Sequence, residues 1–331
     1  MNKEKSHYLT LITDNEEKVL AGGSVSIEEA EQLFNIPDEY LTHLTAAADR
    51  IRIRFTGSSF DACSLINAKS GRCTEDCAFC AQSGRHRSDC EVYPLKPEAE
   101  ILKAAENASL NGATRFCTVT SGAALSDSEF DALTQSLSKA KREVDIALDA
   151  SLGFLNDRRA DLLKSAGVTR YNHNLETERD YFPNICTTHT FDDRVNTVLT
   201  VKRHGMSICS GGIIGLGETP LHRIRLAITL RELGVDCIPI NILNPRPGTR
   251  LADSIPPKPM EILRTIAIFR FILPSATIKI AGGREANLRD FQGMALRSGA
   301  NGMIIGGYLT TGGRDVKQDL DMIREAGFER S

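Results

Sequence analysis

The chain has 331 residues, of which 41% are hydrophobic and 25% are charged, so it can form one large domain or two ordinary ones. Its net charge of −3 and pI of about 6.2 give no argument for nucleic acid or an anionic membrane surface as a partner, and we expect neither. The first residues are too polar for a signal peptide and no apolar run approaches the ~20 residues that cross a bilayer, so we expect a cytoplasmic protein. In that compartment, nine cysteines indicate metal or redox chemistry rather than disulfides.

Residues 1–55 are predicted to be helical. Ser24 and Ser26 precede acidic and apolar residues in the pattern of a capped helix, and residues 38–55 continue with apolar residues at helical spacing. About fifty residues would form only a thin core by themselves. We therefore expect a helical extension, residues 1–55, that covers one end of a larger domain formed by residues 56–331.

Short apolar or β-branched runs alternate with longer helical patterns from residue 61 onwards. Such alternation favours parallel strand pairing, and eight repeats predict an α/β fold of the (β/α)8 TIM-barrel type. An open doubly wound sheet is the alternative, but no G-x-G-x-x-G follows the first strand. The predicted strands are 63–67, 114–120, 144–150, 168–174, 206–214, 235–243, 276–281 and 302–306.

Three cysteines, Cys73, Cys77 and Cys80, follow the first predicted strand in the spacing C-x3-C-x2-C. Thiolates this close repel one another unless a metal neutralises them, so the spacing indicates a ligand set. A structural zinc site would need a fourth cysteine or a histidine at a set spacing, and the sequence offers none. Three protein ligands leave one metal position open, which suits a cluster that also binds another molecule.

Polar and thiol side chains lie at or near the ends of the other predicted strands. Each has an ordinary alternative, because a single cysteine is often a small core residue, an asparagine can cap a turn and an arginine can form a surface ion pair. Active sites of such barrels lie at the C-terminal ends of the strands, so the joint occurrence of these residues predicts a polar, thiol-bearing cavity. The residues are Cys117, residues 171–177, Cys209, Asn241, Asn244 and Arg284.

The segment INAKSGRCTEDCAFCAQS, residues 66–83, resembles the radical S-adenosylmethionine enzymes, and the biotin synthase family in particular. TRFC, YNHNLET, CSGGIIGLGET and GGRE follow in that family's order, so the resemblance covers nearly the whole chain. It implies that Cys73, Cys77 and Cys80 hold a 4Fe–4S cluster whose fourth iron binds S-adenosylmethionine. Reductive cleavage of this cofactor would give a 5′-deoxyadenosyl radical that abstracts hydrogen from dethiobiotin, while an auxiliary iron–sulfur cluster donates the sulfur of biotin.

The resemblance also implies which residues bind S-adenosylmethionine. Phe79, at the aromatic position inside the cysteine motif, would lie over the adenine. Ile213 and Ile214 would help to line the adenine site. Asn174 and Glu176 would bind the ribose hydroxyls, which suits a carboxylate because it accepts two hydrogen bonds from vicinal hydroxyls.

Three asparagines are implied to bind the substrate, dethiobiotin. Amide side chains both donate and accept hydrogen bonds, as a neutral urea requires, so Asn172, Asn174 and Asn241 would contact the ureido ring or the carboxylate end. By the same resemblance we expect a flavodoxin or ferredoxin as the reductant and a homodimer as the assembly.

The auxiliary cluster is where the sequence departs from the family's pattern, which is a 2Fe–2S cluster held by three cysteines and an arginine. Cys117, Cys209 and Arg284 match three of these ligands and would be the catalytic residues of sulfur transfer. The third cysteine is replaced by Asp149, in LDASLGF. A carboxylate is a harder ligand than a thiolate, although it can bind iron.

Other cysteines could take the place of Asp149. Cys186 and Cys90 are predicted to lie in loops on the catalytic face and could reach the cluster, whereas Cys63 and Cys237 are near strand starts and are interpreted as core residues. The surplus of cysteines makes a modified or larger sulfur-donating cluster a second hypothesis.

Two other functions remain open at this stage. A related radical enzyme, similar to a hydrogenase maturase or to methylornithine synthase, would share the barrel and the cysteine motif, and Asp149 favours it. A non-catalytic iron–sulfur or zinc scaffold is less favoured, since the strand-end asparagines and Arg284 would then have no purpose. An inability to bind S-adenosylmethionine would favour the scaffold.

Overall fold

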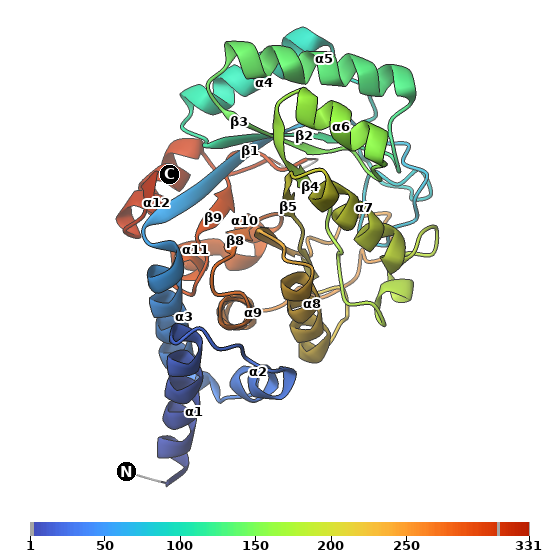
Figure 1. Ribbon diagram of the computed structural model, residues 1–331. Helices are drawn as coiled ribbons and strands as arrows, with labels where there is room; N and C mark the ends of the chain where they lie inside the picture. The colour runs from blue at the N-terminus through green and yellow to red at the C-terminus, as the bar shows by residue number, and fades with distance from the viewer. Residues whose placement is uncertain (1–2, 310–311, 331) are drawn as a thin grey trace.

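A computed structural model describes residues 3–309 and 312–330 of the chain. Three helices precede the first strand, and the second of them begins with a reciprocal cap between Ser26 and Glu29. These helices pack against two helices from the other half of the chain, with α3 on α9 and α2 on α8 (Figure 1). The bounds are α1 (Lys3–Leu20), α2 (Ile27–Phe34), η1 (Asp38–Tyr40) and α3 (Leu41–Thr56). The division of the chain between residues 55 and 56 stays a prediction.

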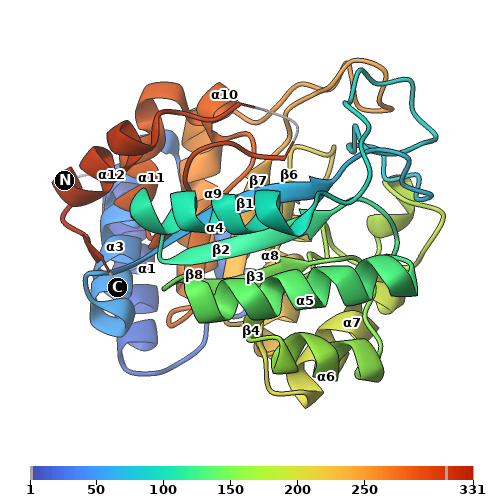
Figure 2. The ribbon, with the colours of Figure 1, turned by 90° about the horizontal axis from the view of Figure 1, so that it is seen from above.

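Parallel strands form a closed barrel, as the alternating pattern predicted. The barrel closes where the first strand, β1, pairs with the last of the ring, β9. Helices surround the strands on the outside, as the two views show (Figures 1 and 2). The strands are β1 (Ser59–Lys69), β2 (Arg115–Thr120), β3 (Ala147–Ser151), β4 (Val168–Asn172), β5 (Ser207–Cys209), β6 (Gly212–Ile214), β7 (Cys237–Ile242), β8 (Thr277–Ile280) and β9 (Gly302–Ile304).

The strand predicted at 206–214 is divided into β5 and β6, and both pair with β7. The break lies at Ser210 and Gly211, where the chain passes so close to β7 that a Cβ on Gly211 would lie 2.1 Å from the carbonyl oxygen of Pro239. Only glycine permits this approach. A further short strand, β10 (Glu329–Arg330), pairs with the start of β1 outside the ring.

The helices that follow the strands begin with the capping signals visible in the sequence. Ser126 and Thr190 each accept a hydrogen bond from the backbone three residues on and form a capping box. Among the described residues, no helix is long and apolar enough to cross a membrane. The bounds are α4 (Glu98–Leu110), α5 (Asp127–Glu143), α6 (Asp157–Ser165), η2 (Phe182–Asn184), α7 (Phe191–Arg203), α8 (Pro220–Glu232), α9 (Pro259–Ile272), α10 (Arg284–Leu288), η3 (Arg289–Phe291), α11 (Gln292–Leu296) and α12 (Val316–Glu325).

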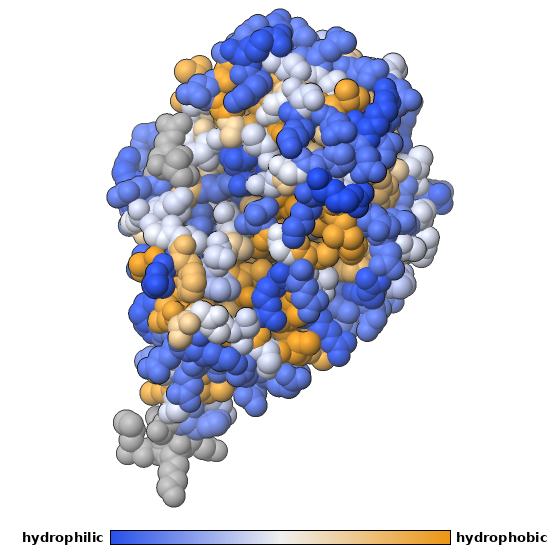
Figure 3. Space-filling model, viewed as in Figure 1, coloured by the Kyte–Doolittle hydropathy of each residue, from blue (hydrophilic) through white to orange (hydrophobic). Residues whose placement is uncertain are grey.

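Polar side chains cover most of the face seen in Figure 3, and the apolar side chains on this face gather toward its middle. The core itself is extensive, since Leu, Ile, Val, Phe and Ala side chains of the strands and of the surrounding helices are buried together. Helix α9 contributes the most continuous buried run, because every residue from Ile262 to Ile272 is buried. This rigid packing fixes the positions of the strands whose side chains point into the barrel.

Inside the barrel, five charged side chains form a buried layer that we call the charged floor. Asp61 on β1 forms ion pairs with Lys279, whose Nζ is 2.7 Å from its carboxylate, and with Arg170, whose Nη1 is 2.6 Å from it. Arg115 Nη2 is 2.5 Å from the Asp149 carboxylate. Burial by itself would raise the pKa of Asp61, but Lys279 and Arg170 outweigh it and hold that pKa well below its usual value. The charged floor therefore consists of paired ions, which lie beneath the cavity described next.

Candidate active site

A cavity of about 330 Å³ lies within the barrel. Side chains from most of the strands line it, because alternate residues of each strand point inward. Cys80 and Phe79 contribute from the cysteine loop, and Cys117 and Cys209 contribute from β2 and β5. Cys117 and Cys209 were predicted to share a cavity, and the structure brings them together there with Cys80 and Phe79.

The loop that follows β1 holds the three cysteines of the motif. Cys73 N–H donates to the carbonyl of Gln82 at 3.0 Å and Cys80 N–H donates to the carbonyl of Cys77 at 3.0 Å, so the loop folds back on itself. Ala78 N–H donates to the carbonyl of Ile185 at 2.8 Å and ties the loop to the segment before α7. Burial raises the pKa of Cys80 to about 11, so this thiol stays neutral until a metal displaces its proton.

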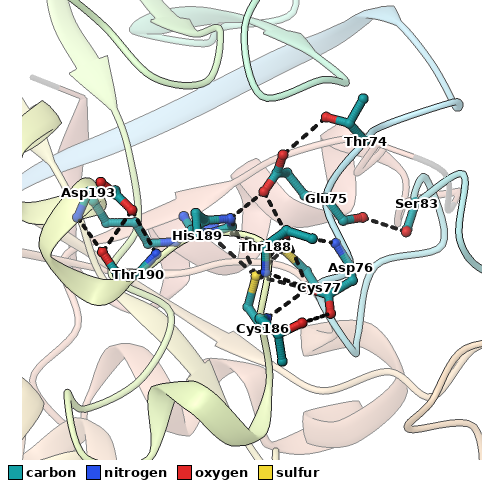
Figure 4. A network of polar contacts seen from close by, with 12 residues as sticks. Thr74, Glu75, Asp76, Cys77, Ser83, Cys186, Thr188, His189, Thr190 and Asp193 are labelled. Carbon is teal, nitrogen blue, oxygen red and sulfur yellow. Dashed lines mark hydrogen bonds and ion pairs between the residues drawn. The ribbon is translucent and has the colours of Figure 1, made fainter.

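A polar network fixes the cysteine loop against residues 185–190 (Figure 4). Asp76 Oδ1 accepts from the backbone N–H of Thr187 at 2.8 Å and from Cys186 Sγ at 3.2 Å. His189 Nδ1 is 2.6 Å from the Glu75 carboxylate. These contacts hold the cysteine loop in one geometry.

Cys186 belongs to this network, which corrects its prediction as an auxiliary ligand. Its Sγ lies 3.9 Å from Cys77 Sγ, and it is absent from the wall of the cavity that Cys117 and Cys209 line. The reason is the fold of the segment after β4, which passes over the cysteine loop and carries Cys186 to the first cluster motif. Cys90, the other loop cysteine considered, is 3.5 Å from Ser70 Oγ and does not line the cavity either.

The last residue of β4 and residues that follow it supply unmet hydrogen-bond acceptors to the cavity. Asn172 Nδ2 donates to Cys117 Sγ at 3.2 Å, while its Oδ1 is buried without a partner. Glu176 Oε2 is also buried without a partner. Burial raises the pKa of Glu176, and the neighbouring guanidinium of Arg194 opposes that rise. Buried acceptors without partners are costly, so the site fits a ligand that donates hydrogen bonds.

The backbone of Glu176 is itself strained, with a φ of 69° that a residue with a side chain rarely adopts. Two hydrogen bonds stabilise this conformation: Glu176 N–H donates to Gly211 O at 3.1 Å, and Ile213 N–H donates to Glu176 O at 2.8 Å. Gly212 is needed for this contact, since a Cβ there would lie 2.4 Å from the carbonyl oxygen of Glu176. Strain of this kind is concentrated at functional sites.

Asn241 lines the cavity, as predicted, but most of its hydrogen-bonding capacity is used by the protein. Its Oδ1 accepts from Gly282 N–H at 3.0 Å and from Tyr308 Oη at 2.9 Å, and its Nδ2 donates to Gly212 O at 3.2 Å. One N–H of the amide therefore remains for a ligand. Asn174 and Asn244 also line the cavity.

Ile213 lines the cavity, whereas Ile214 does not, which corrects the prediction that both residues do. The two residues follow one another on β6, and successive side chains of a strand point to opposite faces. Ile214 is buried in the core outside the barrel's interior wall.

The deep part of the cavity contains more thiols than predicted. Cys63 on β1 lines it together with Cys117 and Cys209, and Cys237 Sγ lies 3.5 Å from Cys209 Sγ. Burial raises the pKa of Cys63 to about 12. Cys63 is buried, as a core residue is, but β1 begins at Ser59, so Cys63 lies within the strand and also lines the cavity.

Asp149 and Arg284, the two other predicted ligands of the auxiliary cluster, do not line the cavity. The Asp149 carboxylate is bound by Arg115 in the charged floor. Arg284 Nη2 is 2.5 Å from Asp319 Oδ2 on α12, and its Nε donates to Ile304 O at 3.2 Å. The chain turns at Gly283, where α10 begins, and the side chain of Arg284 is directed to α12 and not into the cavity.

Two cavity residues that sequence reasoning missed are Lys279 and Arg194. Lys279 lines the cavity from β8. A lysine within an otherwise apolar strand is unusual, and this feature of the sequence could have identified it. Arg194 Nη1 donates to Asn174 O at 2.9 Å, and Nη2 is 3.9 Å from Cys77 Sγ. Arg194 gave no signal, because an arginine in the first turns of a helix is usually a surface residue.

Comparisons with known proteins agree with this geometry. The family model of the radical SAM superfamily matches residues 68–230, and that of the Biotin and Thiamin Synthesis associated domain matches residues 239–329. A biotin synthase of Pelotomaculum thermopropionicum is 49% identical over 308 residues, covering 93% of this chain and 96% of that protein. A biotin synthase of Citrifermentans bemidjiense is 46% identical over 319 residues, which cover 96% of this chain and 97% of that protein.

Solved structures with the same fold are more distant in sequence. Methylornithine synthase superposes with a TM-score of 0.82 at 18% identity and covers 96% of this chain and 97% of that one. The FeFe-hydrogenase maturase of Carboxydothermus hydrogenoformans superposes with a TM-score of 0.80 at 18% identity, and the match covers 97% of this chain and 79% of that one. At this identity they show the fold alone.

The barrel and the superfamily match together define a radical S-adenosylmethionine enzyme. Such an enzyme carries a 4Fe–4S cluster and S-adenosylmethionine, and the open ligand position of a three-cysteine loop fits that pair. Because its curated relatives match nearly the whole chain at up to 49% identity, the chain belongs to the biotin synthase family. Members of this family carry an auxiliary iron–sulfur cluster as well.

Proposed function

We propose that the chain converts dethiobiotin to biotin by radical insertion of sulfur. The observation that carries this proposal is the single cavity that has Cys80 and Phe79 of the cysteine loop in its wall and the thiols of Cys117 and Cys209 deeper inside. A radical generated at the loop and a sulfur donor held on the strands would then share one enclosed space. Family membership at up to 49% identity supports the same reaction.

The first cluster and its cofactor would be held by the cysteine loop and the residues after β4. Cys73, Cys77 and Cys80 would ligate the 4Fe–4S cluster, and Phe79 would lie against the adenine. The free Oε2 of Glu176 supports its role in accepting a hydrogen bond from a ribose hydroxyl. When bound, these groups supply the 5′-deoxyadenosyl radical, and the auxiliary cluster supplies sulfur.

The substrate would be held by complementary amides. A cyclic urea presents N–H donors and a carbonyl acceptor, and the free Oδ1 of Asn172 and the remaining N–H of Asn241 are the matching groups. Asn172 also donates to Cys117 Sγ, so the same side chain would orient both the substrate and the thiol of Cys117. Holding the reacting groups in one geometry is the main contribution a protein can make to such a reaction.

Enclosure is the other contribution of the chain. The cavity lies within a closed ring of strands, and apolar side chains such as Leu65, Val119 and Ile304 form part of its wall. Excluding water protects reactive species from side reactions. Arg194 donates a hydrogen bond to the carbonyl of Asn174 and lies near Cys77, so it would fix the position of the cofactor-binding residues relative to the cysteine loop.

Two further expectations rest on resemblance to the family. We propose a small flavodoxin or ferredoxin as the electron donor and a homodimer as the assembly. Light scattering coupled to size-exclusion chromatography under anaerobic conditions tests the second, and a monomer at all concentrations would contradict it.

An anaerobic turnover experiment tests the proposed reaction. The protein is reconstituted with iron and sulfide and then mixed with S-adenosylmethionine, a reductant and dethiobiotin, and biotin and 5′-deoxyadenosine are measured by mass spectrometry. Formation of both products is expected. 5′-Deoxyadenosine without biotin would leave a radical enzyme with a different substrate, and neither product from protein that carries its clusters would overturn the proposal.

A further inference from the structure

Four cysteines lie in the wall of the cavity or next to a cysteine of that wall. Cys63 and Cys117 lie on the neighbouring strands β1 and β2, and both line the cavity. Cys209 on β5 also lines it, and Cys237 is its direct partner on β7. The Cys209 and Cys237 sulfur atoms are 3.5 Å apart. Three thiols therefore line the same space, and the fourth, that of Cys237, lies next to the thiol of Cys209.

The side chains that would otherwise complete an auxiliary ligand set are already engaged. The carboxylate of Asp149 is held by Arg115 within the charged floor. Arg284 is held by Asp319 on α12 and does not line the cavity. Releasing either group for ligation would leave a buried charge without its partner, which is strongly unfavourable. Cys63 and Cys237 need no such rearrangement, because each is already next to another thiol or to the cavity.

The charged floor provides a favourable electrostatic environment for an anion. It holds three cationic side chains, Arg115, Arg170 and Lys279, against the two carboxylates of Asp61 and Asp149. The layer thus has one positive charge in excess, and Lys279 belongs both to it and to the cavity wall. A cluster ligated by thiolates is an anion, so this surplus opposes the penalty of burying it.

The spacing of the thiols indicates a cluster instead of a single ion. Among the described residues, the only group of three or more possible ligands whose atoms all lie within 4.8 Å of one another is Cys77, Cys186 and His189. The four deep thiols are spread more widely. Ligands of an iron–sulfur cluster bind different irons and so stand further apart than those of one ion, and four cysteines are the usual ligand set.

We propose that Cys63, Cys117, Cys209 and Cys237 ligate the auxiliary cluster of this chain, with Lys279 as the cationic neighbour of the cluster. Each thiol releases its proton to solvent as its Fe–S bond forms. The inference rests on the proposed function in one respect, namely that the cluster at this position is the sulfur donor. Ligation itself is independent of turnover and is measured without substrate.

The test uses full-length protein in which Cys73, Cys77 and Cys80 are replaced by Ala, so that only the auxiliary cluster can assemble. Cys63→Ser and Cys237→Ser are added separately to this parent. Iron and sulfide per chain, the Mössbauer spectrum and the loss of iron to a chelator are measured anaerobically. Cys90→Ser and Cys186→Ser are matched controls, because each removes a thiol that neither lines the cavity nor lies next to Cys209: Cys90 lies by Ser70, and Cys186 lies by Cys77.

We expect Cys63→Ser and Cys237→Ser to change the Mössbauer parameters of one iron site and to speed iron loss about tenfold or more, since even residues behind the ligands have effects of that size. The controls should match the parent. Unchanged spectra in both deep variants, or a change in Cys186→Ser, would overturn the ligand set. Circular dichroism verifies that each variant is folded, and Cys63→Ala with Cys237→Ala repeats the measurement if a serine variant is not.

The outcomes separate this inference from the proposed function. If the deep variants lose the cluster signature while the wild type makes no biotin, the ligand set stands and the reaction is wrong. If the wild type makes biotin and the deep variants keep an unchanged cluster, the reaction stands and the ligand set is wrong. A parent protein that assembles no cluster at all would overturn the ligand set as well.

Discussion

The buried ion pair of Arg284 and Asp319 should stabilise the fold and leave the auxiliary cluster untouched. Both side chains are at most 1% exposed, and they lie 2.5 Å apart. Arg284→Met removes the guanidinium and leaves the Asp319 carboxylate buried, and Asp319→Asn does the reverse. Each single change is expected to lower the free energy of unfolding by about 3–5 kcal/mol. The double variant should lose less than the sum of the two.

The expected shift in melting temperature follows from chain length. An unfolding entropy of about 2.1 cal/mol/K per residue gives about 0.7 kcal/mol/K for a chain of 331 residues. Each single variant should therefore melt about 4–7 °C below the wild type. Thermal unfolding is followed by circular dichroism on anaerobically reconstituted protein, and the Mössbauer spectrum is recorded on the same samples. A variant that melts like the wild type but has an altered auxiliary spectrum would refute this account and restore Arg284 as a ligand.

Three further predictions address the cofactor site, the strand break and a surface histidine. Glu176→Gln should weaken the binding of S-adenosylmethionine about tenfold, as measured by calorimetry, because it removes a charged hydrogen-bond acceptor. The iron content should stay unchanged. An unchanged affinity would contradict the assignment of Glu176 to the cofactor site. Gly211→Ala should lower the free energy of unfolding by about 1–3 kcal/mol in denaturant titrations, because its Cβ would meet Pro239 O at 2.1 Å, and a neutral result would show that the strands can separate there. Hydrogen bonds that His204 donates to the carboxylates of Asp157 and then Asp161 raise the pKa of His204 above 6.5. The resulting stabilisation is complete below pH 6.5 and is lost as the pH rises through the folded pKa. His204→Gln should remove this part of the pH dependence of unfolding, and an identical pH profile would exclude the contact as its source.

The fold was predictable because every repeat has its own local signal. Strand and helix periodicities alternate along the chain, and parallel pairing then leaves few topologies. The cysteine loop was predictable for a similar reason, since its three ligands are close in sequence. Both depend on patterns within short windows of residues.

The complete set of proposed ligands of the auxiliary cluster was not predicted, because it depends on the residue at which each strand begins and on which of its side chains point into the barrel. A predicted start of the first strand at residue 63 put Cys63 at the end of the barrel, whereas the strand starts at Ser59. Arg284 follows the glycine at which the chain turns into α10, and the position of that turn is set by tertiary packing. Asp149 was placed on the right strand and faces inward, but its long-range pairing with Arg115 is invisible in the sequence.

The central claim is that sulfur held inside this barrel becomes the sulfur of biotin. The most direct measurement is a single turnover by protein reconstituted with isotopically labelled sulfide, freed of excess sulfide and mixed with S-adenosylmethionine, reductant and dethiobiotin. The account predicts that mass spectrometry finds the label in biotin, and that the yield of labelled biotin falls with the auxiliary cluster in Cys63→Ser. Unlabelled biotin formed at the same yield would contradict it, because the sulfur would then come from outside the cavity.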